Sequence, residues 1–171
     1  PAIGLSQASI VYEALAEGGL TRMMAIFTDV DDITIGSIRS SRPYFISMAQ
    51  AYDAIYVHAG GSEQAYSDIK TLGIDNIDGV RGGRPGEASS YYRDQTRLNE
   101  GRNLEHTLFA KGSDLASFAK DNYDMKHADS YDTSYGLHFS PEAVSQCSKS
   151  AADFTVYYSG YSTDFKYSAD K

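Results

Sequence analysis

The order of apolar runs and turn residues between positions 34 and 72 constrains the fold more than any other feature of the chain. A short apolar run, 34–38, leads to Arg42-Pro43, and a proline at the first helical position predicts that a helix begins there. A second strand-like run, 54–58, enters a glycine turn, after which Ser62 would cap another helix. Strand, helix, strand, turn and helix in this order are typical of α/β folds. We therefore predict an α/β (mixed α+β) domain with a central mixed sheet and flanking helices.

The segments on either side add further expected elements. Residues 20–28 have the composition of a buried strand, whereas 6–16 fits either a helix or the first strand of a hairpin that turns at Glu17. Residues 75–90 are rich in glycine and aspartate and predict a loop. The apolar spacing of 113–122 predicts another helix.

The C-terminal part of the chain predicts a β-hairpin. Residues 153–158 alternate apolar and polar side chains, Gly160 offers a turn, and Phe165 begins a second alternating segment. Because two strands do not form a stable sheet alone, we expect a further strand-rich region to follow them. We accordingly divide the chain into a main domain, 1–149, and the start of a β-rich domain, 150–171.

Composition excludes several classes of protein. The 171 residues carry a net charge of −8, whereas duplex binding needs a basic surface, so we expect no nucleic-acid partner. The single cysteine, Cys147, can form neither an internal disulfide nor a cysteine-rich zinc site. The four histidines are too scattered to indicate a metal site by spacing, and the chain has no Walker loop or calcium loop. We therefore expect neither a metal nor a cofactor.

The positive charges are segregated by type along the chain. All eight arginines lie between Arg22 and Arg102, and most lysines follow them. The guanidinium fork matches carboxylate and phosphate geometry, whereas lysine is a flexible point charge. This pattern indicates either an anion site in the first part of the chain or ion pairs with acids there, such as Glu13, Glu17 and Asp53.

Both strand-to-helix junctions are candidate binding elements. Arg39 and Arg42 flank the first, where backbone N–H groups at a helix start favour an anion. The second, His58-Ala-Gly-Gly-Ser62, has two glycines that would let a ligand approach the backbone. His58 could serve as a general base or ligand contact, and a structural histidine is the alternative. The segment lacks the full Gly-x-Ser-x-Gly pattern, so Ser62 is better explained as a helix cap than as a nucleophile.

A third polar cluster follows in the sequence. Arg93 and Arg97 lie in one short segment, and His106 follows in the next. These side chains could line a site, or they could connect a loop to the sheet through salt bridges, which contribute little when exposed.

Five stretches together resemble the YerB-type lipoprotein family of Gram-positive bacteria, a domain of unknown function. Their order and spacing carry the resemblance, which covers the chain to about residue 110. The stretches are Gly4-Leu-Ser-Gln-Ala-Ser-Ile-Val-Tyr-Glu13, Glu17-Gly-Gly-Leu-Thr-Arg22, Ile38-Arg-Ser-Ser-Arg-Pro-Tyr-Phe45, Tyr52-Asp-Ala-Ile-Tyr-Val-His-Ala-Gly-Gly-Ser62 and Tyr92-Arg-Asp-Gln-Thr-Arg97. The chain departs from the family pattern at Asn103-Leu-Glu-His-Thr107, where the family has Pro-His-Asn.

The resemblance implies an extracytoplasmic protein. Family members resemble secreted lipoproteins, so this chain would be an ectodomain attached to the outer face of the cell membrane by a lipid outside the given sequence. The family pattern also implies a strand before Pro1, a hairpin at Glu17-Gly-Gly19 and a separate domain from about residue 150. It supplies no activity.

Three functions are consistent with these observations. The first is a binding module for an anionic or glycan cell-wall component, such as a glycopolymer, through an arginine-rich cleft. The second is an envelope phosphotransferase or hydrolase, and the third is a protein-interaction scaffold that uses the tyrosine-rich C-terminal half. The expected ligand-binding residues are Arg22, Arg39, Arg42, His58, Gly60, Gly61, Ser62, Arg93, Arg97 and His106, with Glu13, Glu17 and Asp53 in supporting positions.

Overall fold

The computed structural model describes residues 2–127, 131, 140, 142, 146 and 152–167. The predicted domain boundary near residue 150 and the single cysteine, Cys147, lie outside these residues, and the division into two domains stays a prediction. The strands are β1 (Ile10–Leu15), β2 (Thr21–Ile26), β3 (Thr34–Gly36), β4 (Tyr56–His58), β5 (Asn76–Asp78), β6 (Tyr91–Arg93), β7 (Leu108–Lys111), β8 (Asp153–Tyr158) and β9 (Tyr161–Lys166). The α-helices are α1 (Pro43–Ala51), α2 (Glu63–Leu72), α3 (Gln95–Asn99) and α4 (Gly112–Asn122).

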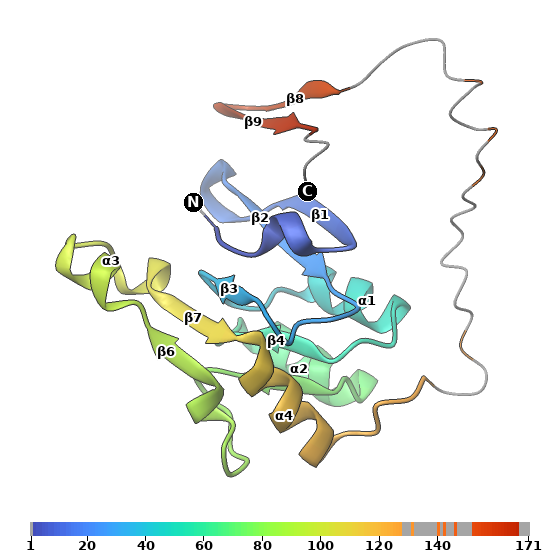
Figure 1. The fold of residues 1–171 in the computed structure, drawn as a ribbon, viewed down its shortest axis with the longest axis vertical. Helices are drawn as coiled ribbons and strands as arrows, with labels where there is room; N and C mark the ends of the chain where they lie inside the picture. The colour runs from blue at the N-terminus through green and yellow to red at the C-terminus, as the bar shows by residue number, and fades with distance from the viewer. Residues whose placement is uncertain are drawn as a thin grey trace.

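The central layer is a mixed sheet built in two parts (Figure 1). Strands β3, β7 and β6 form an antiparallel sheet with β7 in the middle, and β4 and β5 form a parallel pair. Residues 38–41 join the two parts. The N–H of Ile38 donates to the carbonyl of Leu108 at 2.8 Å, and the N–H of Ser41 donates to the carbonyl of Gly60 at 2.8 Å. This arrangement confirms the predicted α/β class.

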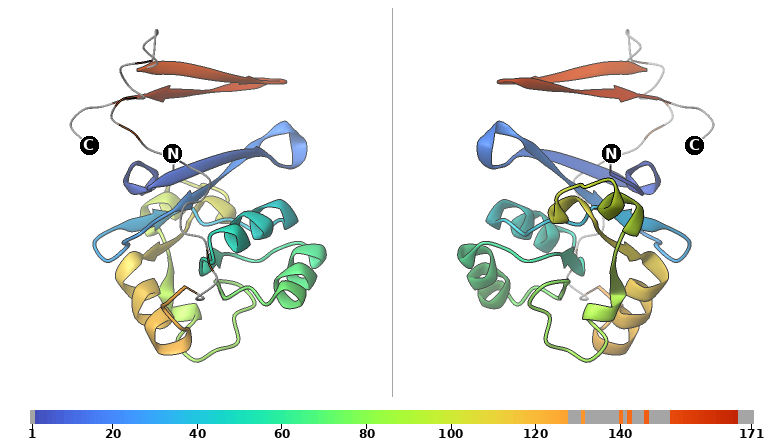
Figure 2. Two further views of the ribbon diagram at one scale, coloured as in Figure 1. Left: turned by 90° about the vertical axis from the view of Figure 1, so that its right-hand side faces the viewer. Right: turned by 90° about the vertical axis from the view of Figure 1, so that its left-hand side faces the viewer.

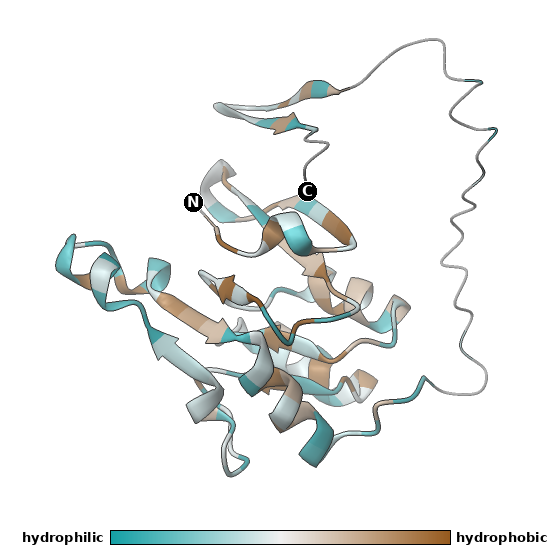
Figure 3. Cartoon of the chain, in the orientation of Figure 1, coloured by the Kyte–Doolittle hydropathy of each residue, from teal (hydrophilic) through white to brown (hydrophobic). Residues whose placement is uncertain are grey.

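Helices cover both sides of this layer. Helices α1 and α2 pack together around Phe45, Ile46 and Ile69, whereas α4 packs Leu115 and Phe118 against the strands. Figure 2 shows α1 and α2 on one side of the sheet and α4 on the other. Hydrophobic residues lie along β7, which Figure 3 shows in brown at the centre of the fold. The core is therefore divided into two clusters by the sheet.

Local signals explain which elements the sequence predicted. Pro43 is the first residue of α1, and the Ser62 hydroxyl caps α2 by accepting the N–H of Ala65 at 3.2 Å. The region predicted as a loop, 75–90, instead contains the three-residue strand β5. Strand β7 was also not predicted, because four residues are too few for a periodic pattern.

Within the segment 6–16, Ile10–Leu15 forms a strand and not an α-helix, after a short 3-10 turn at Leu5–Gln7. Strands β1 and β2 pair in antiparallel fashion and are joined by a turn over Glu17–Gly19, in which Gly18 and Gly19 have φ angles of 72° and 74°. Glycine adopts this left-handed conformation without steric cost. Ala14 and Met24 pack against the α1–α2 cluster, so this hairpin covers α1.

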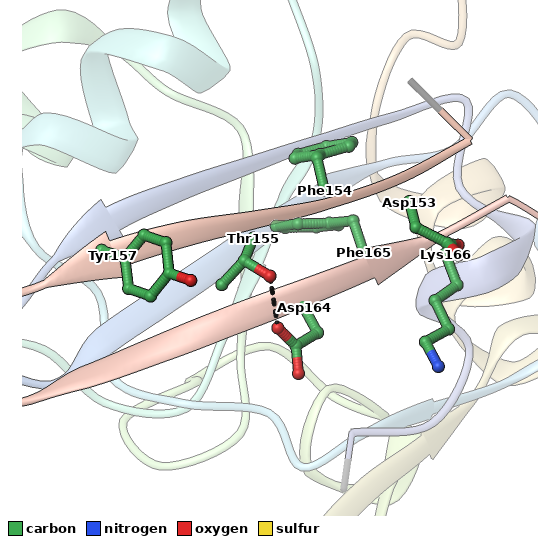
Figure 4. A pocket seen from close by; sticks show the side chains of 7 residues that line it. All are labelled: Asp153, Phe154, Thr155, Tyr157, Asp164, Phe165 and Lys166. Atoms are coloured by element: carbon green, nitrogen blue, oxygen red, sulfur yellow. Dashed lines mark hydrogen bonds between the residues drawn. The ribbon is translucent and has the colours of Figure 1, made fainter. Parts of the chain in front are cut away.

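The C-terminal hairpin lies against the other face of β1 and β2. Strands β8 and β9 pair in antiparallel fashion, and Thr163 of β9 donates a hydrogen bond to Glu13 Oε1 at 2.7 Å. An open cavity of about 470 Å³ lies on this hairpin, and the Thr155 hydroxyl there donates to Asp164 at 2.7 Å. Figure 4 shows the lining side chains, with Phe154 stacked on Phe165. The predicted hairpin is therefore present and is attached to the main domain by a polar contact.

Candidate functional site

The two strand-to-helix junctions lie side by side. Ser41 forms a parallel bridge with Gly61, and the N–H of Ala59 donates to the carbonyl of Arg39 at 3.0 Å. Any larger residue at position 61 would place its Cβ only 3.3 Å from the Cβ of Ser41. The close approach of the two segments therefore favours glycine at this position. The starts of α1 and α2 therefore share one edge of the sheet, as expected for strand ends in an α/β fold.

At this edge two arginines share one carboxylate. Arg22 Nη2 lies 3.3 Å from Glu17 Oε2, and Arg42 Nε contacts Glu17 Oε1. We call these three residues the Arg22–Glu17–Arg42 cluster. The two arginine side chains are only 16% and 19% exposed, whereas Glu17 is 60% exposed. The cluster therefore presents its anion to solvent and holds its cations in the protein surface.

Each arginine of the cluster is also fixed by a backbone carbonyl. Arg22 Nη1 donates to the carbonyl of Ser40 at 2.8 Å, and Arg42 Nη1 donates to the carbonyl of Ser41 at 2.7 Å. Both guanidinium groups are thus held against the 38–42 segment by bonds that do not involve Glu17. A hydrogen bond from a charged donor is worth roughly 1.5–3 kcal/mol, so these contacts position the arginines firmly.

The electrostatics of the cluster show crowded positive charge. Burial, together with the nearby charges of Arg42 and Arg39, lowers the pKa of Arg22 despite the opposing effect of Glu17. The hydrogen bond from Arg42 lowers the pKa of Glu17 to about 2. Arg22 therefore lies within electrostatic reach of two further guanidinium groups: Arg42, which shares Glu17 with it, and Arg39, which pairs with Glu105.

Two tyrosines lie beside this charge. Burial raises the pKa of Tyr56, and the positive charges of Arg22 and Arg42 oppose this by lowering it. The hydroxyl oxygen of Tyr44 is buried, lies within electrostatic reach of Arg22 and makes no hydrogen bond to any described residue. Tyr44 therefore has a hydrogen-bonding group next to the arginines that is free among the described residues. Leaving such a group unpaired costs roughly 1–3 kcal/mol.

The other predicted arginines serve a different purpose. Arg93, Arg39 and Arg97 each donate to one of three consecutive carbonyls, those of Leu104, Glu105 and His106 respectively. Arg39 also pairs with the Glu105 carboxylate at 3.0 Å and approaches His106 Nδ1 at 3.3 Å. The third polar cluster of the sequence therefore holds the turn Leu104–His106 in place through hydrogen bonds. This arrangement matches the alternative in which these side chains connect a loop to the sheet.

His58 is part of a buried polar network. It is 1% exposed, with Nδ1 2.8 Å from the carbonyl of Gly60 and Nε2 3.2 Å from Asn76 Oδ1. This position matches the structural alternative for His58 and leaves its ring nitrogens unavailable to a ligand. Ser62 likewise acts as the cap of α2.

The centre of this network, Asp78, was not anticipated from the sequence. Its carboxylate accepts the N–H of Gly60 at 2.7 Å, the N–H of Val80 at 2.9 Å and the hydroxyl of Tyr66 at 2.7 Å. Burial would raise the pKa of Asp78, but these hydrogen bonds hold it below its ordinary value. Asp78 thereby fixes the glycine turn beside the 38–42 segment. The sequence pattern did not single out Asp78, because the strand that it ends, β5, lies in a region predicted as a loop.

Two of the expected supporting acids do not orient the arginines. Glu13 and Arg22 occupy neighbouring register positions on β1 and β2 that point to opposite faces, and Glu13 Oε1 accepts from Thr21 at 2.6 Å and from Thr163. Asp53 lies beyond the C-terminal end of α1 and approaches His127 Nδ1 at 3.3 Å. Of the three, Glu17 alone contacts Arg22 and Arg42 in the described residues.

Other features of the described residues lie elsewhere or give no site. A cavity of about 530 Å³ between Gly86–Ser90 and α4 is lined by Asp114, Ser117 and Asp121, away from the arginines. Within 2–127, 152–167 and the isolated described positions, no group of three histidine, cysteine or acidic side chains could hold a metal ion. In the same residues, no helix has the length and apolar character needed to cross a membrane.

Comparison with known proteins identifies relatives of the chain. A family model described as "Protein of unknown function (DUF3048) N-terminal domain" matches residues 1–131. The curated protein "Putative lipoprotein YerB" of Bacillus subtilis (strain 168) is 42% identical over 80 residues, which are 47% of this chain and 24% of that protein. The crystal structure of the YerB protein from Bacillus subtilis superimposes with a TM-score of 0.62 at 31% identity, covering 74% of this chain and 41% of that one. The chain thus spans less than half the length of these relatives.

Proposed function

The chain belongs to the family of DUF3048 N-terminal domains, and on this basis we propose that it is the ectodomain of a cell-envelope lipoprotein that binds an anionic group of a cell-wall ligand. Arg22 and Arg42 bind the anion, while Arg39, whose charge Glu105 balances, lies within electrostatic reach of Arg22. The proposed partner is a cell-wall glycopolymer or another anionic ligand of the envelope. The curated relative is named "Putative lipoprotein YerB", and this chain would likewise reach the membrane through a lipid anchor, on its outer face.

One observation carries this proposal, which is the excess of positive charge in the Arg22–Glu17–Arg42 cluster. Two guanidinium groups share a single exposed carboxylate, and a third arginine lies within electrostatic reach. Elsewhere, the exposed pairs Arg81–Glu63 and Arg102–Glu100 join one cation to one anion. The cluster therefore retains a net positive charge that an external anion would neutralise.

Two neighbouring features support an anion at this position. Helix α1 begins at Pro43 with Arg42 as its N-cap, and no side chain caps it by a hydrogen bond. The partial positive charge of a helix start adds to that of the arginines. The buried Tyr44 hydroxyl supplies a further group that lacks a partner among the described residues.

The two alternative functions have less support. A phosphotransferase would need an available base, but the His58 ring nitrogens already have hydrogen-bonding partners and the side chain is 1% exposed. An interaction scaffold would use β8–β9, where Tyr157 is 81% exposed. The phosphotransferase alternative would use the same arginines, whereas the scaffold alternative does not explain why two arginines converge on one carboxylate.

Titration calorimetry with inorganic phosphate tests the proposal. We expect the wild-type chain to bind phosphate and Arg42→Gln to weaken binding at least tenfold. Arg81→Gln is the matched control, because Arg81 also pairs with a glutamate, Glu63 at 2.9 Å, but lies outside the cluster. Equal binding by all three proteins, or none by the wild type, would contradict the proposal.

A further inference from the structure

The position of Glu17 itself resembles that of a bound anion. Its two carboxylate oxygens each contact a different arginine, Oε1 at Arg42 and Oε2 at Arg22. A carboxylate and a phosphate both offer such a pair of oxygens to guanidinium groups. Glu17 therefore satisfies, from within the chain, the arrangement of charges that an external oxyanion would satisfy.

We propose that the Glu17 carboxylate is an internal substitute for the ligand, and that the ligand's oxyanion displaces it from between Arg22 and Arg42. This inference rests on the proposed function and defines the binding subsite within it. The group bound there is an oxyanion with at least two oxygens, either a carboxylate or a phosphate. Glu17 is then a competitor of the ligand and not part of its binding surface.

The arginines keep their places when Glu17 leaves. Arg22 remains bonded to the carbonyl of Ser40 and Arg42 to that of Ser41, at 2.8 and 2.7 Å. Both side chains are largely buried. The subsite is therefore preorganised for an incoming oxyanion, which lowers the cost of binding it.

Glu17, in contrast, is free to move away. Its side chain is 60% exposed and lies at the start of a turn that contains Gly18 and Gly19. No heavy atom would lie within 4 Å of a Cβ built on Gly18, so there is open space beside Glu17 at this residue of the turn. Exposed ion pairs are weak, which allows an external anion to compete with this one.

Repulsion between the arginines disfavours a site that holds no anion. Removing Glu17 leaves the buried Arg22 facing the charge of Arg42 without a compensating anion; burial and this charge already lower the pKa of Arg22. This state is unfavourable until another anion arrives. The protein without ligand therefore holds Glu17 in place until an external oxyanion takes over its contacts with the two arginines.

The test compares anion binding by the wild-type chain, Glu17→Gln and the control Glu63→Gln. Glu63 pairs with Arg81 on the surface, so its replacement removes one negative charge outside the cluster. Inorganic phosphate and sodium acetate are titrated separately by calorimetry, which distinguishes a phosphate from a carboxylate subsite. We expect Glu17→Gln to bind the preferred anion about fivefold more tightly than the wild type, since exposed ion pairs are worth up to about 1 kcal/mol. Glu63→Gln should bind as the wild type does.

The outcomes separate this inference from the proposed function. If the wild type binds but Glu17→Gln binds equally or more weakly, Glu17 is not a competitor and the inference fails, while the proposed function stands. If neither protein binds phosphate or acetate, both fail. Glu17→Ala, which removes the hydrogen-bonding group altogether, must show the same gain as Glu17→Gln; a loss with the alanine would overturn the inference.

Discussion

The carboxylate of Asp78 accepts the backbone N–H of Gly60 at 2.7 Å, and this bond connects the end of β5 to the turn that follows β4. The same turn is bonded through the carbonyl of Gly60 to Ser41, next to Arg42. A buried acid thus positions the backbone beside the proposed anion site without being part of it. The role of Asp78 is structural support for the arginines.

Replacing Asp78 should therefore destabilise the protein. Asp78→Asn keeps the size of the side chain but places an amide N–H₂ group among three donors, those of Gly60, Val80 and Tyr66. We expect a loss of roughly 2–3 kcal/mol in the free energy of unfolding, measured with urea. The control is Asp75→Asn, an exposed aspartate in the same segment, which should change stability by less than about 0.5 kcal/mol. Equal effects of the two variants would refute the supporting role.

The stabilisation that Asp78 supplies should disappear in acid. Hydrogen bonds to its carboxylate hold the folded-state pKa of Asp78 below the ordinary value of 3.8. A lowered pKa gives stability that is complete above the unfolded-state value and is lost as the pH falls through the folded-state value. The difference in unfolding free energy between the wild type and Asp78→Asn should therefore shrink from about pH 7 to about pH 2. A difference that stays constant over this range would contradict the assignment.

Loss of the hydroxyl should lower the stability of the protein at one of two tyrosines whose hydroxyl is buried, but not at the other. Tyr91 donates its hydroxyl to the carbonyl of Ile77 at 2.7 Å, whereas the Tyr44 hydroxyl has no partner among the described residues. We expect Tyr91→Phe to lose roughly 1–2 kcal/mol of unfolding free energy and Tyr44→Phe to lose none. Thermal unfolding of both variants checks this. A loss in Tyr44→Phe equal to that in Tyr91→Phe would show that the Tyr44 hydroxyl is already bonded without a ligand.

Thr163 is one of the contacts that attach the C-terminal hairpin, beside a hydrogen bond between Tyr158 and Glu13. Its hydroxyl donates to Glu13 across the two hairpins, whereas the Thr155 hydroxyl donates to Asp164 within β8–β9. Thr163→Val should leave a partly buried carboxylate with one hydrogen bond fewer and speed amide exchange in residues 153–166. Thr155→Val is the control and should leave exchange there almost unchanged. Faster exchange in both variants would mean that the contact with Glu13 does not hold the hairpin.

Local signals let the sequence predict the elements next to the site, but not the contacts between them. Pro43 and Ser62 begin their helices as predicted, because a proline at the first position and a capping serine act over only a few residues. Arg39 and Glu105 are 66 residues apart, and no pattern in the chain indicates that they pair. Sequence reasoning therefore named Glu17 as a possible partner of the arginines but did not connect Arg39 with Glu105.

Two strands, β5 and β7, were not predicted from the sequence. Strands β5 and β7 contain three and four residues, and their conformation depends on neighbours supplied by distant segments. Without β5 the sequence gives no reason to place Asp78 beside Gly60. The tertiary arrangement decides these positions, which is why the network around His58 emerged only from the structure.

The most direct test of anion binding at the Arg22–Glu17–Arg42 cluster is an NMR titration of the ¹⁵N-labelled chain with inorganic phosphate. The side-chain Nε–H signals of Arg22 and Arg42 and the backbone amide of Tyr44 report on the site, and the Nε–H signal of Arg81 serves as the internal control. We predict saturable shifts of the first three signals and none of the fourth. Unchanged Arg22 and Arg42 signals, or shifts of all arginines alike, would contradict the proposed site.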